Sequence, residues 1–258
     1  FPTRRSSDLR IPFLLSSVLV LIGLWIRKDI DETPEFKQVK QSGQVAKAPL
    51  RDTLKYHWRE VLIAAGLKVV ETAPFYIFST FVVSYATTTL SYQKSQALEA
   101  VTLGALVATV MIPLMGLLSD RIGRQKMYTL SVVLLGLFIV PWFLLLDTRS
   151  TWGIALATVI AFGILWAPVT AVLGTLCSEI FSANVRYTGI TLGYQLGAAL
   201  AGGTAPLIAT GLLAKYDGDW IPVAWYLAGT VVISLIAIFC ASRLKQAPGA
   251  VATRSEML

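Results

Sequence analysis

Lys68 and Glu71 are two ionisable side chains inside a long apolar run that covers residues 60–85. Their spacing of three residues places both on one face of a helix, where an ammonium group and a carboxylate can pair. Ionisable groups inside a bilayer are costly, and they usually face a water-filled cavity or a partner. We therefore expect Glu71 to exchange a proton, because desolvation favours its neutral form, and Lys68 to bind a solute carboxylate. The alternative is a pair whose two members only neutralise each other or lie nearer a membrane interface.

Other polar and aromatic side chains could complete a solute site around this pair. Thr72 and Tyr76 continue the Lys68 face at helical spacing. Pro74 breaks the helical hydrogen bonding of the same run and frees carbonyl oxygens that could line a cavity. Trp166, in the middle of another run, could contact a solute, or could only face lipid or serve as packing bulk. The residues expected to bind solute are Lys68, Thr72, Tyr76, Trp166, Thr191 and Gln195.

Enzymatic chemistry has no support in the sequence. The chain contains no nucleophile with a paired base and no glycine loop that could cradle a phosphate. Cys177 and Cys240 are far apart and belong to no Cys/His cluster, so they indicate neither a metal site nor a disulfide framework. His57, the single histidine, lies in a polar segment and is expected to be solvated or interfacial. We expect no enzyme, no cofactor and no metal; a membrane enzyme or a receptor-like regulator is the competing class.

The composition is that of an integral membrane protein. Hydrophobic residues make up 55% of the chain, the mean hydropathy is +0.66, and charged residues are 14%, against roughly 25% in soluble domains. The net charge of +7 would suggest nucleic acid as a partner of a soluble protein. Here the cations fall mostly in loops on one side of the predicted spans. The membrane therefore accounts for them, and no nucleic acid partner is expected.

Seven apolar runs approach the length of about 20 residues that a helix needs to cross a bilayer core. The first run is slightly short, and we interpret it as a helix whose beginning is missing. The predicted fold is an all-α integral membrane bundle, with a polar linker that includes a short interfacial helix at residues 50–58. The predicted spans cover residues 11–26, 60–85, 97–118, 127–146, 152–177, 187–213 and 221–243.

A short charged segment, residues 116–126, is predicted to form a tight turn between two antiparallel spans. Its pattern G-x-L-x-D-R-x-G-R resembles the loop between the second and third helices of a six-helix half in the major facilitator superfamily of transporters. In that family the aspartate faces the start of a neighbouring helix, whose dipole favours negative charge. The resemblance assigns this role to Asp120 and implies gating roles for Arg121, Gly123 and Arg124. The alternative is an ordinary basic loop that obeys the positive-inside rule.

A second segment resembles one particular group of transporters within this superfamily. SEIFSANVRYTGITLGYQLG, residues 178–197, is similar to the loop and helix of the metabolite:proton symporters within this superfamily, which include transporters of shikimate, 2-oxoglutarate, citrate, proline and betaine. The segments RIPFLLSSVLVLIGLWIRKDIDETPEF and FYIFSTFVVSY point the same way. Ser182 replaces a proline of that group, and Asn184 replaces a frequent basic residue. The resemblance implies that Glu179 and Arg186 pair with the charged turn and stabilise one access state.

Gly189, Gly193 and Gly197 recur at four-residue spacing in the sixth apolar run. Small residues on one helical ridge let two helix backbones approach closely within a membrane. We expect these three glycines to serve helix packing.

The resemblance also implies the organisation of the chain. Family members have two six-helix halves joined by a cytoplasmic linker, so seven spans correspond to the last helix of the first half and the whole second half. The implied partners are a missing N-terminal half of the same protein, the lipid bilayer, protons and a small solute. The expected segments are a non-native leader at residues 1–9, the last helix of the N-terminal half at 10–28, the linker at 29–58, the six-helix half at 59–243 and a cytoplasmic tail at 244–258.

The implied function is proton symport of a small polar metabolite, either an organic acid or a zwitterion, by alternating access. A proton-coupled exporter or antiporter is the alternative, as is a chain with no transport activity of its own. If the linker is cytoplasmic, most loop cations fall on the cytoplasmic side, as the positive-inside rule requires. We therefore expect a multi-pass protein of a bacterial inner membrane with a cytoplasmic C-terminus.

Overall fold

The computed structural model describes residues 16–26, 49–182 and 185–246, and it divides the chain into two units, Phe1–Val45 and Ala46–Leu258. In the first unit it describes one apolar helix, Ser16–Ile26. The rest of the predicted segment at residues 10–28 lies outside the described residues, as do the predicted leader, most of the linker and most of the tail. The residues predicted to bind or gate a solute all belong to the second unit.

Six helical stretches in the second unit are long and apolar enough to cross a membrane, which confirms the last six predicted spans. Most of them extend a few residues beyond the apolar runs, because a helical backbone continues through polar residues at its ends. Short connections make consecutive stretches antiparallel. The stretches are Trp58–Thr88, Lys94–Ile122, Arg124–Asp147, Thr151–Ser178, Arg186–Lys215 and Ile221–Leu244.

Three of these stretches change from α-helix to π-helix near their middle, a local widening that is often found at functional sites. They consist of α4 Trp58–Tyr76, η1 Ile77–Phe81 and α5 Val82–Thr88; of α8 Thr151–Thr158, η2 Val159–Leu165 and α9 Trp166–Ser178; and of α10 Arg186–Gly197, η3 Ala198–Gly202 and α11 Ala205–Lys215. The other long helices are α6 Lys94–Ile122, α7 Arg124–Asp147 and α12 Ile221–Gln246.

A short helix, α3 Pro49–Tyr56, precedes the first of the six spans, close to where the interfacial helix was predicted. It exposes Leu50 and Leu54. His57 leaves helical geometry, with φ −122° and ψ 20°, so Trp58 begins α4 instead of ending the short helix.

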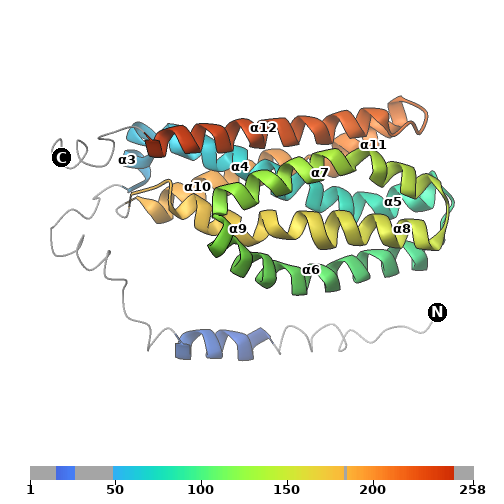
Figure 1. The fold of residues 1–258 in the computed structure, drawn as a ribbon, viewed down its shortest axis with the longest axis horizontal. Helices are drawn as coiled ribbons and strands as arrows, with labels where there is room; N and C mark the ends of the chain where they lie inside the picture. Colours follow the sequence, from blue (N-terminus) through green and yellow to red (C-terminus); the bar gives the residue numbers. More distant parts are fainter. Residues whose placement is uncertain (1–15, 27–48, 183–184, 247–258) are drawn as a thin grey trace. The chain divides into compact units, whose positions relative to one another are not determined.

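Helix α4 lies in the middle of the second unit. It packs against α12 on one side and against α10 and η3 on another, and it also contacts α9. Helix α6 runs along α8, η2 and α9, while α7 contacts both α9 and α12 (Figure 1). The turn of α4 that carries Lys68 and Glu71 therefore lies among side chains from several other helices.

Two glycines set the close approach of α10 to α4. A Cβ atom added at Gly193 would lie 2.5 Å from a side-chain carbon of α4, and one at Gly197 would lie 2.5 Å from the Ala65 carbonyl oxygen. Both distances are shorter than van der Waals contact, so a larger residue would push the helices apart. For Gly189, by contrast, the nearest atoms belong to the ring of Phe181.

Asp147, the last residue of α7, links several helices at the end of the bundle opposite α3. Its carboxylate accepts hydrogen bonds from the indole N–H of Trp220 at 3.0 Å and from the hydroxyl of Tyr85 at 3.4 Å. Trp220 also stacks on Phe143, with ring centroids 4.8 Å apart. These contacts connect α5, α7 and the start of α12 at this end.

Candidate functional site

Lys68 and Glu71 form an ion pair inside the helical bundle. The Lys68 Nζ atom lies 2.5 Å from Oε2 of Glu71, and the two side chains are only 18% and 13% exposed. The Thr72 hydroxyl donates a hydrogen bond of 2.9 Å to the same carboxylate oxygen. One carboxylate oxygen of Glu71 thus contacts both the Lys68 ammonium group and the Thr72 hydroxyl. The pair of Lys68 and Glu71 has no net charge while Glu71 is ionised.

Lys68 also lies over an aromatic ring of the neighbouring span. Its Nζ atom is 4.9 Å from the ring centroid of Tyr194 on α10, within the range of a cation–π interaction. The close approach at Gly197 brings α10 near enough for this contact, since a Cβ atom at Gly197 would lie 2.7 Å from the Lys68 Cβ.

Side chains of α9 and α7 hydrogen-bond to the main chain of α4 beside the ion pair. The indole N–H of Trp166 donates to the Glu71 carbonyl oxygen at 2.6 Å. The hydroxyl of Tyr128 donates to the Leu67 carbonyl oxygen at 2.6 Å, and Tyr128 is completely buried. Each bond fixes the position of α4 relative to another span.

A third span, α12, reaches the same helix through Ser234. The Ser234 hydroxyl donates to the Gly66 carbonyl oxygen at 2.6 Å and accepts a hydrogen bond from the Val70 N–H at 3.1 Å. In a regular α-helix the N–H of residue 70 would donate to the carbonyl oxygen of residue 66. Ser234 therefore bridges the two groups of that helical bond, on the turn that carries Lys68.

Three aromatic rings pack next to the pair. Phe75 lies 5.3 Å from Trp166 and 5.6 Å from Phe162, measured between ring centroids, and the last two rings are 5.2 Å apart. Trp166 is 7% exposed and its N–H is already bonded to α4. In this conformation Trp166 packs and donates to the main chain, and its ring is closed off from solvent.

Tyr76, the last residue of α4, is 37% exposed at the point where the first span becomes π-helical. Gly202 brings η3 close to it, since a Cβ atom at Gly202 would lie 2.9 Å from the Tyr76 ring. Tyr76 is thus reachable from outside the helical core on the same span as Lys68.

Thr191 and Gln195 lie on an exposed face of α10. Each is two residues from a glycine that contacts α4, Gly193 or Gly197, and two helical residues turn a side chain by about 200°. The structure therefore places Thr72 and Trp166 at the ion pair, whereas Thr191 and Gln195 lie on a different face of their helix.

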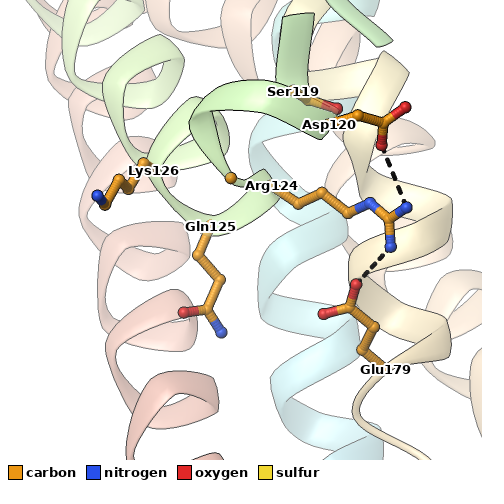
Figure 2. Close-up of a pocket in the computed structure, with 7 residues that line it drawn as sticks. Ser119, Asp120, Arg124, Gln125, Lys126 and Glu179 are labelled. Atoms are coloured by element: carbon orange, nitrogen blue, oxygen red, sulfur yellow. Dashed lines mark hydrogen bonds and ion pairs between the residues drawn. The ribbon is translucent and has the colours of Figure 1, made fainter. Parts of the chain in front are cut away.

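The second candidate site is a cluster of charged side chains at the α6–α7 connection. Arg124 extends between two acidic residues, with NH1 2.6 Å from Glu179 Oε1 and NH2 3.2 Å from Asp120 Oδ1 (Figure 2). Lys126 points away from both carboxylates in the same view. We call Asp120, Arg124 and Glu179 the end-face charge cluster. It joins the start of α7 to the ends of α6 and α9.

The turn at this cluster is much shorter than residues 116–126. Helix α6 continues to Ile122 and α7 begins at Arg124, so Gly123 alone separates them. Gly123 has φ +99°, a conformation that glycine adopts readily. Asp120 and Arg121 consequently belong to the last turn of α6, and the expected loop is wrong in its extent. Charged residues do not end a helix by themselves, whereas the glycine does.

Arg186 is the first residue of α10, and its Nε donates to the Phe181 carbonyl oxygen at 3.4 Å. It therefore lies on the segment that follows Glu179 and stabilises the connection between α9 and α10. Within the part of the chain that the structure describes, no group of three His, Cys, Asp or Glu side chains could hold a metal ion.

Six spans with a partly buried ion pair and a charged connection are typical of a multi-pass membrane protein of transporter type. The family model of the Major Facilitator Superfamily matches residues 5–202 and, in a second match, residues 74–256. The chain belongs to the Major Facilitator Superfamily. The sequence resemblance to this superfamily is thereby confirmed.

Curated relatives are named as transporters of small metabolites. The chain is 32% identical to the shikimate transporter of Escherichia coli over 89% of its own length and 53% of that protein. It is 30% identical to the alpha-ketoglutarate permease of E. coli, covering 88% of the chain and 51% of the permease. It is 29% identical to the proline/betaine transporter of Salmonella typhimurium, covering 88% and 47%. The match to the metabolite symporter group is confirmed, and the chain is not an enzyme.

The chain spans about half the length of these relatives. No solved structure matches it.

Proposed function

We propose that this chain is part of a secondary transporter that moves a small polar metabolite, an organic acid or a zwitterion, together with protons. The observation that carries the proposal is the Lys68–Glu71 pair, which is partly buried within a predominantly apolar span. Ionisable pairs in such positions mark solute or proton pathways in membrane proteins. The names of the relatives agree with solutes that bear a carboxylate.

Protonation of Glu71 is the step that would couple the two fluxes. A neutral Glu71 no longer attracts the Lys68 ammonium group, so the cation becomes available to a solute carboxylate. Because a buried uncompensated charge is costly, an acid enters most favourably when Glu71 carries the proton. A zwitterion, in contrast, can insert between both members of the pair and keep the site neutral without a proton. Tyr76, Thr191 and Gln195 are the further proposed solute contacts.

The end-face charge cluster is proposed to bias the equilibrium between two access states. A contact shifts such an equilibrium only if it is made in one state and lost in the other. Arg124 holds two carboxylates from two different spans, so separation of the ends of α6 and α9 would break at least one of its bonds. Exposed ion pairs are individually weak, and the shared arginine is what makes the pairs act together.

The remaining proposals concern topology. The N-terminal half of the protein, the last helix of which is proposed at residues 10–28, would form the other wall of the solute pathway. The linker at 29–58 and the tail after residue 243 are proposed to be cytoplasmic in a bacterial inner membrane. Support comes from the α6–α7 connection, which lies at the same end of the bundle as α3 and the end of α12 (Figure 1). This connection carries the cations Arg121, Arg124 and Lys126.

Uptake by cells that express the transporter containing this chain tests the proposal. We would supply labelled shikimate, 2-oxoglutarate, citrate, proline and glycine betaine, each with and without a protonophore. Accumulation of one compound that collapses with the protonophore is the expected result. No accumulation of any of them, from protein shown to be folded in the membrane, would contradict the proposal. Release of preloaded solute in exchange for protons would instead indicate an exporter or antiporter.

A further inference from the structure

Tyr194 is a second partner of Lys68 and one that carries no charge. The Lys68 ammonium group lies between the Glu71 carboxylate, at 2.5 Å, and the Tyr194 ring, with its centroid at 4.9 Å. The two partners come from different spans, since Glu71 is on α4 and Tyr194 is on α10. Loss of one partner therefore leaves the other in place.

The ring is fixed by its neighbours along the chain and across the bundle. Gly193 and Gly197, on either side of Tyr194 in sequence, hold α10 against α4. The tyrosine hydroxyl lies against α9, since a Cβ atom added at Gly174 would be 3.8 Å from it. The Lys68 Nζ atom lies over the ring itself and not at its hydroxyl end. Tyr194 thus connects α4, α9 and α10 at one point.

An aromatic ring differs from a carboxylate in what it does to a bound ammonium group. The ring attracts the cation through its quadrupole and leaves the positive charge uncompensated. A carboxylate in the same position would compete directly with a solute carboxylate. A ring is therefore suited to keep Lys68 in place during the interval in which Glu71 has released it.

We propose that Tyr194 is a positioning residue that holds Lys68 for the carboxylate of the solute once Glu71 is protonated, so that carboxylate-bearing solutes are the class this site takes. This inference rests on the proposed function of Lys68 and Glu71. It assigns Tyr194 a role through Lys68 and not a direct contact with the solute.

Two substitutions separate the ring from the hydroxyl. Tyr194→Phe keeps the ring and loses the hydroxyl, while Tyr194→Leu loses both. We expect Tyr194→Leu to raise the KM for uptake of the labelled acids of the panel, shikimate or 2-oxoglutarate, by about tenfold with little change in maximal rate. Tyr194→Phe should keep the KM within about twofold of the wild type. Equal KM increases in both variants would overturn the proposal, as would an unchanged KM in Tyr194→Leu.

Folding is checked in the same membranes through Cys177. In a Cys240→Ser background, which removes the exposed cysteine, Cys177 should stay unreactive to N-ethylmaleimide if the bundle is intact. If Tyr194→Leu exposes Cys177, Tyr194→Met replaces it with the same expected rise in KM. Lys68→Ala separates a failure of the proposed function from a failure of the role proposed for Tyr194. An unchanged KM in Lys68→Ala contradicts the proposed function, whereas a raised KM there with no effect of Tyr194→Leu contradicts only the role of Tyr194.

Discussion

The indole nitrogen of Trp166 lies 2.6 Å from the main-chain carbonyl oxygen of Glu71. This bond joins α9 to α4 at the residue proposed to carry the proton. The bond is made to the main chain, so it fixes the position of the Glu71 backbone. Neither carboxylate oxygen of Glu71 takes part in it. The carboxylate stays available to Lys68 and Thr72.

Trp166→Phe removes that hydrogen bond and keeps most of the aromatic packing. The carbonyl oxygen lies inside α4 and keeps its helical partner, so the loss is that of one hydrogen bond, about 0.5 to 1.5 kcal/mol. We expect thermal unfolding in detergent at a temperature several degrees lower than that of the wild type, and slower uptake because Glu71 is less well positioned. An unchanged unfolding temperature would show that the indole N–H contributes nothing there. Trp152→Phe is the matched control, because Trp152 is 85% exposed.

Gly197→Ala should push α10 away from α4. The added Cβ atom would lie 2.5 Å from the Ala65 carbonyl oxygen, and overpacking of this kind costs about 1 to 3 kcal/mol. Gly211→Ala on α11 is the control, because a Cβ atom there meets nothing within 4 Å. Unfolding in detergent should occur earlier for Gly197→Ala and at the wild-type temperature or above for Gly211→Ala. Equal behaviour of the two variants would contradict the close approach of α10 and α4.

Asp120→Asn tests the end-face charge cluster. The substitution removes one carboxylate of Arg124 and leaves Glu179 as its ion-pair partner. We expect a change of a few-fold in the balance of access states, smaller than for Arg124→Ala, which loses both pairs. The readout is the reactivity of a cysteine introduced at the exposed Thr80, towards an impermeant maleimide in a Cys240→Ser background.

The control for this charge removal lies at the other end of the bundle. Asp217 has φ +50°, a conformation that asparagine also adopts, so Asp217→Asn removes a charge without backbone strain. It should leave the reactivity at position 80 unchanged. The gating proposal for Asp120 is wrong if Asp120→Asn behaves like this control.

The spans and the Lys68–Glu71 pair could be predicted from the sequence because both depend on local rules. A bilayer sets the length of an apolar run, and helical geometry brings residues three positions apart together. The extent of the charged turn was not predicted correctly, since its charges suggested a loop whereas the backbone reverses at Gly123 alone.

The contacts of Tyr128, Tyr194 and Ser234 could not be predicted in the same way. Tyr128 donates to the carbonyl oxygen of Leu67, 61 residues away in the sequence. Ser234 donates to the carbonyl oxygen of Gly66, 168 residues away. A main-chain partner leaves no trace in the pattern of side chains. The available signal was a lone hydroxyl in an apolar run, which shows that a polar partner is needed but not where it lies.

Glu71→Gln is the most direct test of proton coupling. Glutamine keeps the shape of the side chain and can still accept the hydrogen bond of Thr72, but it neither ionises nor takes up a proton. We expect a transporter that still exchanges labelled for unlabelled acid and no longer accumulates it in response to a pH gradient. Glu99→Gln, at an exposed position on α6, should accumulate the acid as the wild type does. If Glu71→Gln retains proton-driven accumulation, Glu71 is not the coupling residue. The ion pair with Lys68 would then serve only to neutralise two charges inside the bundle.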